Sequence, residues 1–133
     1  MITVPVSIGE LIDKITILKI KQQKITDFEK LANVNKEYGL LMEILNKNSS
    51  IDENHELFME LYTLNLEFWE YHDWQREKWA SLKNSSTIID IELYRRNEDE
   101  HILNDKRAEI KKKINKMFNS DIIEEKQFKS YEI

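Results

Sequence analysis

Four charged side chains interrupt the apolar face of the last long helix that the sequence predicts. At helical spacing, Arg96, Glu100 and Arg107 fall inside a face otherwise made of leucine, isoleucine and methionine, and Lys111 falls at its edge. A guanidinium binds a carboxylate or a phosphate through two parallel N–H donors. Because burying such a charge without a partner costs several kcal/mol, the pattern predicts either a structural ion-pair network or an anion-binding pocket.

The preceding predicted helix carries polar side chains on its own apolar face. If the chain turns near residue 85, His72 should lie opposite Glu100, and Arg76 should lie near Arg96. In one interpretation these groups form ion pairs that fix the register of the two helices. In the other they bind a phosphorylated or carboxylated small molecule. The candidate ligand-binding residues are then Asn65, His72, Arg76, Arg96, Glu100, Asn104 and Arg107.

The sequence gives little support for a metal-binding site. The acids Glu53-x-x-Glu56 and Glu70-x-x-Asp73 imitate the magnesium motifs of helical nucleotide pyrophosphohydrolases. One uninterrupted helix would hold Glu56 and Glu70 about 21 Å apart, too far to share an ion. The histidines lack the spacing of a helical zinc motif, and the chain has no cysteine. We therefore expect no metal and no cofactor, and the sequence leaves open whether the chain is an enzyme.

The composition predicts an all-α fold. Of the 133 residues 34% are charged and 41% hydrophobic, and there are only two glycines and one proline. So few turn residues disfavour a β-sandwich, whereas the balance of charged and apolar residues suits amphipathic helices. The length suits a single domain, residues 1–133.

The charge and the hydropathy limit the partners that we expect. A formal net charge of −5 argues against a dedicated nucleic-acid binder, which normally carries a basic excess. The sequence shows no secretion signal and no apolar run of the roughly 18 residues that a membrane span needs. We expect a cytoplasmic protein without a membrane partner.

Capping residues predict the first two helical stretches. Ser7, followed three positions later by Glu10, forms a capping box that starts a helix at Ile8. A second box at residues 26–29 marks either a break or a kink, so the sequence does not decide whether the first two stretches form one helix. The polar run at residues 46–50 ends the second stretch.

Two long helices, at about residues 52–82 and 88–118, are expected to complete a helical bundle as an extended antiparallel hairpin. Ser86 or Thr87 is the predicted N-cap of the second of them. The tail after residue 120 is expected to dock on the bundle through its apolar side chains, which are Ile122, Ile123, Phe128 and Tyr131.

Three apolar side chains point to contacts with another chain. Ile17 and Ile20 lie off the main apolar stripe of the first helix, and Trp74 falls among acids on the outer side of the third. Our first functional hypothesis is therefore a helical interaction module that forms a homodimer and binds a protein partner. The alternative is an enzyme or a small-molecule-binding bundle that uses the arginine and asparagine cluster.

Three stretches carry a family resemblance. The N-terminal stretch reads VPVSIGELIDKITIL, and the last helix has the pattern NDxRAxxKxxIN at residues 104–115. With the stretch at residues 29–34, they resemble an uncharacterised bacterial family of small helical proteins. The chain departs from the family pattern at Lys19, where an acid is expected, and at Phe28, where proline is expected. The resemblance implies no activity, but it does imply an association with surface-polysaccharide genes and hence with sugar-nucleotide or glycan enzymes.

Overall fold

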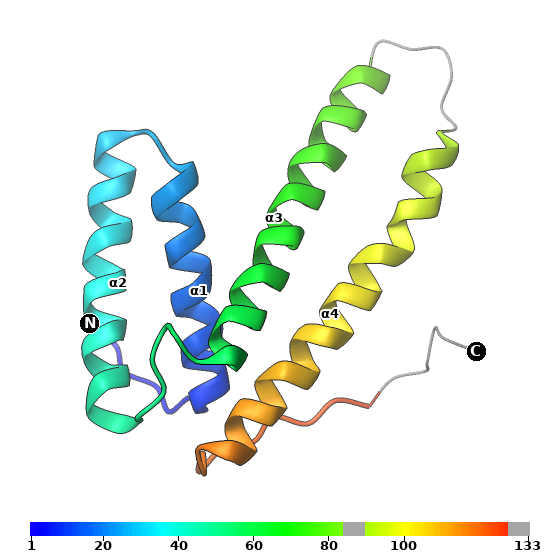
Figure 1. Cartoon of the computed structure of the whole chain (residues 1–133). Helices are drawn as coiled ribbons and strands as arrows, with labels where there is room; N and C mark the ends of the chain where they lie inside the picture. Colours follow the sequence, from blue (N-terminus) through cyan, green and yellow to red (C-terminus); the bar gives the residue numbers. More distant parts are fainter. Residues whose placement is uncertain (84–89, 128–133) are drawn as a thin grey trace.

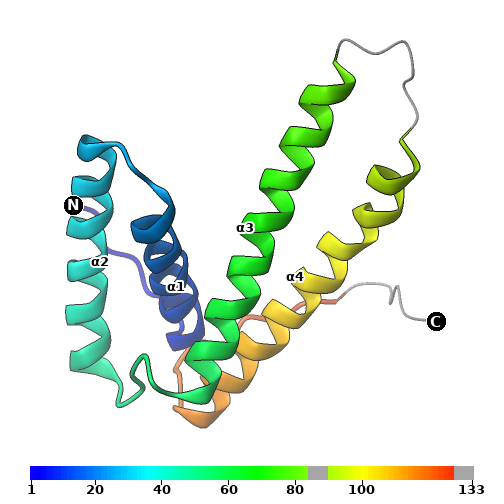
Figure 2. The same cartoon turned by 45° about the horizontal axis from the view of Figure 1, so that its top comes forward.

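Two antiparallel helical hairpins make up the described part of the chain (Figure 1). The computed structural model describes residues 1–83 and 90–127. The helices are α1 (Ile8–Lys24), α2 (Phe28–Asn48), α3 (Glu56–Leu82) and α4 (Ile91–Met117). The α1/α2 and α3/α4 hairpins meet at one end, which we call the vertex, and diverge at the other, as Figure 2 also shows. The described residues contain no strand, which confirms the all-α prediction.

The first hairpin follows the capping residues of the sequence. The Ser7 hydroxyl accepts a hydrogen bond from the amide N–H of Glu10 at 3.0 Å, and α1 begins at Ile8 as predicted. The second box is a break rather than a kink, because Asp27 caps a new helix by accepting from the N–H of Lys30 at 2.9 Å. The helix α2 therefore folds back along α1 (Figure 1).

The long helices start later than predicted. The side chain of Asp52 accepts from the N–H of Asn54, which forms a turn, and the imidazole of His55 then caps α3 by accepting from the N–H of Leu57 at 3.1 Å. The helix α4 begins at Ile91, capped by the carboxylate of Asp90. The predicted caps at residues 86 and 87 and the tail residues 128 and 131 lie outside the described residues.

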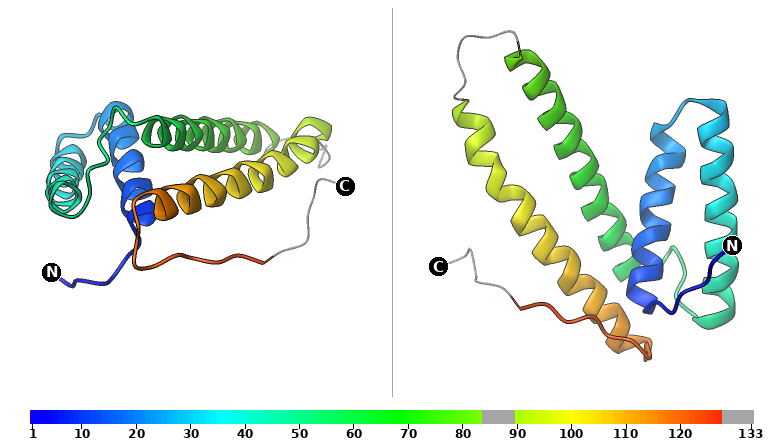
Figure 3. Two further views of the ribbon diagram at one scale, coloured as in Figure 1. Left: turned by 60° about the horizontal axis from the view of Figure 1, so that its bottom comes forward. Right: turned by 180° about the vertical axis from the view of Figure 1, so that it is seen from behind.

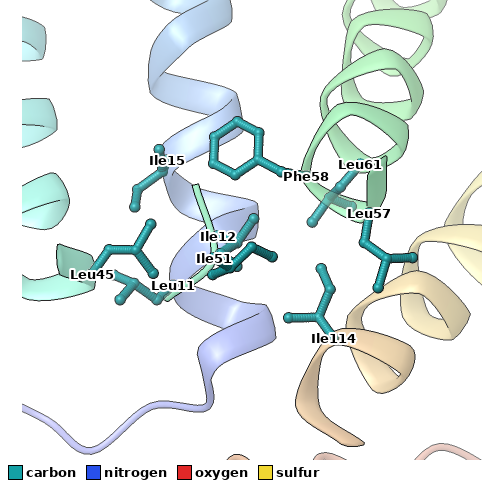
Figure 4. Close-up of a cluster of buried hydrophobic side chains, with 9 residues drawn as sticks. All are labelled: Leu11, Ile12, Ile15, Leu45, Ile51, Leu57, Phe58, Leu61 and Ile114. Carbon is teal, nitrogen blue, oxygen red and sulfur yellow. The ribbon is translucent and has the colours of Figure 1, made fainter. Parts of the chain in front are cut away.

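The hydrophobic core lies at the vertex, where α1 packs against each of the other three helices. Figure 4 shows its nine side chains converging from α1, the end of α2, the α2–α3 connection, the start of α3 and the end of α4. They are Leu11, Ile12, Ile15, Leu45, Ile51, Leu57, Phe58, Leu61 and Ile114. Burying a side chain of this size contributes about 1.5–3 kcal/mol. Beyond Tyr71 on α3 and before Leu103 on α4, no described residue is buried, so the distal half of that hairpin is a two-helix arm.

The helices α1 and α4 approach closely at Gly9. Its N–H donates to the side-chain oxygen of Asn115 at 2.6 Å. A Cβ at this position would lie 2.6 Å from the carbonyl oxygen of Lys111, closer than Cβ atoms approach a neighbouring backbone atom in real structures. A residue without a side chain is therefore needed where these two helices cross.

The tail turns back beyond the end of α4 (Figure 3), and polar contacts hold it against the bundle. The carboxylate of Glu124 accepts hydrogen bonds from the Ser7 hydroxyl and from the amide of Asn115. The expected docking through apolar side chains is not observed in the described part of the tail, because Ile122 and Ile123 remain 38% and 40% exposed. The apolar contacts predicted for these two residues therefore do not form the main attachment.

Candidate ligand-binding cleft

A buried polar cluster joins α1, α3 and α4 just above the core. The carboxylate of Asp13, only 1% exposed, accepts from Arg107 Nε at 2.9 Å and from Arg107 Nη2 at 2.5 Å. It also accepts from the amide of Asn65 at 2.9 Å, and the same amide donates to the Thr16 hydroxyl at 2.9 Å. The Thr16 hydroxyl in turn donates to the backbone carbonyl of Asp13 at 2.7 Å. Each member of the cluster therefore has a partner on another member.

This geometry keeps Arg107 charged. The hydrogen bonds to Asp13 raise the pKa of the Arg107 guanidinium above its ordinary value, and they outweigh the opposing effect of burial. A bidentate pair of this kind is stronger than two neutral hydrogen bonds and fixes the plane of the guanidinium. Arg107 thus has a set orientation before any ligand arrives.

Two further polar contacts join α1 to α4, nearer to the vertex than the contact between Asp13 and Arg107. Lys111 Nζ lies 2.5 Å from Glu10 Oε2, and Asn115 accepts from the N–H of Gly9. Residues 9, 10 and 13 therefore meet residues 115, 111 and 107 in antiparallel order, and we call this set the α1/α4 contact line. The first and the last of the three stretches that carry the family resemblance lie against each other here.

A cleft of about 660 Å³ opens above this cluster, between α1 and the inner face of the α3/α4 hairpin. Its apolar wall comes from Ile17, Ile20, Phe68 and Trp69. Its polar side chains are Asn65, His72, Asn97, Glu100, His101, Asn104 and Arg107. Concave sites with an apolar wall and a few convergent polar groups are the usual form of small-molecule sites.

Five of the seven predicted ligand-binding residues line this cleft, namely Asn65, His72, Glu100, Asn104 and Arg107. His72 Nε2 lies 3.3 Å from Glu100 Oε1, the pairing expected from the hairpin register. The other two predicted residues lie elsewhere. Arg76 is exposed to solvent and lines no part of the cleft. Arg96 faces the opposite side of the hairpin, where its guanidinium carbon lies 4.1 Å from the centre of the Trp74 ring and its Nε donates to Asp99 at 3.3 Å.

A family of unknown function (DUF6165) matches residues 2–132. The chain belongs to this family. No curated protein and no solved structure matches the chain. The DUF6165 family has no known function, so the proposed function of this chain rests on the geometry of the cleft. No described helix is long and apolar enough to cross a membrane.

The residues predicted to form an interface between copies also make contacts inside the single chain. Ile20 is 1% exposed, and both Ile17 and Ile20 line the cleft. Trp74 is half-buried beneath Arg96 instead of projecting outward. Helical periodicity alone did not reveal these contacts, because α1 packs against α3 and α4 as well as against α2 and so buries more than one face.

Sequence reasoning missed the residue that organises the site, Asp13. A signal was present, since Asp13 and Thr16 directly follow Ile12 and Ile15 of the apolar stripe, so one edge of that stripe is polar. A carboxylate beside a stripe that faces the core requires a cationic partner. The cleft residues Asn97 and His101 were also missed, and they give no distinctive signal.

The cleft carries little net positive charge. Arg107 is paired with the buried Asp13, and Glu100 adds a second carboxylate beside His72. Asn97 and Asn104 each offer one acceptor and two donor hydrogens, and an imidazole offers one of each when neutral. Among the described residues no group of three or more histidine, aspartate or glutamate side chains could hold a metal ion. The cleft is thus suited to a ligand that both donates and accepts hydrogen bonds.

Proposed function

We propose that this protein binds a small polar molecule in the cleft between α1, α3 and α4. The observation that carries the proposal is the combination of an apolar wall, convergent polar side chains, and an arginine held from behind by a buried carboxylate. A guanidinium fixed in this way loses little conformational entropy when it binds.

The charges of the cleft narrow the kind of ligand. Asp13 binds the Nε hydrogen and one Nη2 hydrogen of Arg107. The two Nη1 hydrogens and the second Nη2 hydrogen are left as donors, and they can bind the two oxygens of one carboxylate or phosphate group. Glu100 lies in the same cleft and repels a second negative charge. The phosphorylated or carboxylated ligand expected from the sequence is therefore better restricted to a singly charged or neutral molecule rich in hydroxyl or amide groups.

A thermal-shift screen tests the proposal. Neutral sugars, sugar nucleotides, hydroxy acids and di-acids would be compared, because a ligand at 100 times its dissociation constant stabilises the folded state by about 2.7 kcal/mol. Asn104→Ala should abolish the shift of any true ligand, since Asn104 lines the cleft. The matched control Asn33→Ala, at an exposed position on α2, should retain it. A shift equal in both variants, or no shift with any compound, would count against the proposal.

A second candidate function is self-association through the distal arm of the α3/α4 hairpin, in keeping with the hypothesis of a homodimer and a protein partner. One observation favours it. Trp79, Ile91 and Tyr94 are 54%, 61% and 82% exposed near the end of the arm. Large exposed apolar and aromatic side chains are typical of protein interfaces.

The mass in solution tests this candidate at concentrations of tens of micromolar. The combined variant Trp79→Gln/Tyr94→Ser should convert a dimer into a monomer, while Phe28→Ser, at a position 86% exposed on the other hairpin, should leave the dimer intact. A wild-type chain that is monomeric would remove the candidate.

We also propose a bacterial origin and a cytoplasmic location. The absence of cysteine suits a reducing compartment. We further propose that the motifs at residues 4–18 and 104–115 mark the family, because their side chains meet in the α1/α4 contact line. Fractionation of cells that produce the protein tests the location.

A further inference from the structure

A groove runs along the face of the α3/α4 hairpin that points away from the cleft. Two adjoining hollows, of about 650 and 250 Å³, share Glu67 and Lys106 and together form this outer groove. From Glu56 to Tyr71 the groove follows α3 for about 22 Å at 1.5 Å per residue. That is the length of a helix of about 15 residues laid along the hairpin.

The rim of the outer groove is acidic. Five carboxylates line it, those of Glu56, Glu60, Glu67, Asp99 and Glu109, against the two cations of Arg96 and Lys106. Asp99 is hydrogen-bonded to Arg96, and Glu109 has Lys113 at 3.9 Å. The glutamates therefore leave a clear excess of negative charge over the groove.

The floor of the same groove is apolar. Leu64 is 7% exposed, Ile110 is half-buried, and Met59 remains 56% exposed. An unbranched methionine adapts to the shape of whatever packs on it, and such side chains are common on surfaces that bind amphipathic helices. An apolar floor with an acidic rim complements a helix that has an aliphatic stripe flanked by lysine or arginine.

A buried hydroxyl provides an independent indication of an occupant. Tyr71 is 2% exposed and borders the smaller hollow, and its hydroxyl has no hydrogen-bond partner among the described residues. A buried polar group that is left unpaired is costly, so native proteins rarely retain one without a reason. Tyr71 borders the smaller hollow, so a polar group of an occupant would pair with this hydroxyl once the side chains that cover it move aside.

We propose that the outer groove docks a basic amphipathic helical segment of a partner protein. The apolar stripe of that segment packs on Met59 and Leu64, and its basic side chains face the glutamates of the rim. The end of the segment reaches the hollow at Tyr71. This site is separate from the cleft, which lies on the other face of the hairpin, so either one can exist without the other.

Fluorescence anisotropy with a labelled peptide tests the proposal on the full chain. The probe is an amphipathic helix of lysine, leucine and alanine about 15 residues long, and the comparison peptide has the same composition in scrambled order. We expect saturable binding of the probe that weakens as salt is raised, and at most weak binding of the scrambled peptide. Absence of saturable binding, or equal binding of both peptides, would overturn the proposal.

Matched charge variants separate docking from general attraction. The groove variant Glu60→Gln/Glu67→Gln/Glu109→Gln should bind the probe about 10-fold more weakly, at roughly 0.5 kcal/mol for each lost charge pair. The control variant Glu37→Gln/Glu70→Gln/Glu77→Gln removes the same charge at exposed positions outside the groove and should bind within about 2-fold of wild type. Equal losses in the two variants would show that only net charge attracts the peptide, and would overturn the proposal.

Tyr71→Phe provides the second readout. Without peptide this variant should unfold at the same or a higher temperature than wild type, because it removes a buried hydroxyl that has no protein partner. With peptide its affinity should fall severalfold. A clear loss of thermal stability in the free protein, or an unchanged affinity for the probe, would contradict the role given to this hydroxyl.

Discussion

The proximal and distal halves of the α3/α4 hairpin each place an arginine of α4 beside an aspartate, yet the two pairs differ in kind. Arg107 binds Asp13 of α1 through two N–H groups at 2.9 and 2.5 Å, and the aspartate side chain is 1% exposed. Arg96 binds Asp99 of its own helix through one N–H at 3.3 Å, and that aspartate side chain is 47% exposed. The difference is the third helix. Where α1 covers the hairpin, an arginine becomes part of the interior, and where two helices stand alone, it remains a surface residue.

The largest effect should follow from breaking the proximal pair. Asp13→Asn leaves a partly buried guanidinium without its counter-charge, and we expect it to lower the free energy of unfolding by about 3 kcal/mol in urea denaturation. The distal counterpart Asp99→Asn should cost less than about 1 kcal/mol. Equal losses in these two variants would remove the distinction between the halves.

The double variant Asp13→Asn/Arg107→Met sharpens that comparison. Because no charge is left unpaired, the double variant should be more stable than the sum of the two single changes predicts. Strict additivity would mean that the two side chains are not coupled.

The two glycines should respond in opposite directions. Gly9→Ala places a Cβ 2.6 Å from the carbonyl oxygen of Lys111, so α1 must move away from α4, and we expect a loss of about 2 kcal/mol. Gly39 in α2 has no atom within 4 Å of such a Cβ, and Gly39→Ala should stabilise the protein by about 0.5–1 kcal/mol through helix propensity. Thermal unfolding of both variants measures these two changes in stability. A Gly9→Ala variant as stable as the wild type would contradict the close crossing of α1 and α4 at the vertex.

Removal of the distal arginine should have a small effect. Arg96→Ala loses the stacking on Trp74 and Tyr71, which contributes about 0.5–1 kcal/mol at a partly exposed site. Arg96→Lys should recover part of that loss. A loss as large as that of Asp13→Asn would show that the distal arm is packed as tightly as the vertex.

The smallest effect concerns pH at the start of α4. The N–H of Leu93, and then the neighbouring Lys78, hold the pKa of Asp90 below its ordinary value. The contribution of this cap is therefore present above the ordinary aspartate pKa and is lost as the pH falls through the lower pKa of the folded state. The protection factor of the Leu93 amide, which is the exchange rate of an unstructured peptide at the same pH divided by the observed rate, should fall in acid in the wild type. In Asp90→Asn the protection factor should be the same at neutral and acidic pH. A wild-type protection factor that does not change with pH would contradict this account.

Local signals in the sequence predicted most of the fold. Ser7 fixed the start of α1, and apolar spacing located both long helices within a few residues of their ends. The register of the α3/α4 hairpin also brought His72 to Glu100, as expected. These features depend on neighbouring residues or on one turn, so a single sequence contains the information needed.

The remaining features depend on contacts between distant parts of the chain. Asp13 and Arg107 lie on helices that are not neighbours in sequence, and nothing in either stretch alone identifies its partner. The same holds for Ile20, which turned inward because α1 packs on several helices at once. Arg96 falls on the same calculated face as Arg107, but only one of the two lies where α1 can cover it.

The attachment of Glu124 to Ser7 has a consequence for the order in which the chain folds during synthesis. Ser7 leaves the ribosome early, but the carboxylate that its hydroxyl binds lies 117 residues further on. The partners of Gly9, Glu10 and Asp13 are also among the later residues to be made. Contacts of such sequence separation slow folding and leave unpaired surface exposed until they form. The earliest helix to emerge is thus among the last to be completed, and Asp13 waits for its arginine until α4 has been translated.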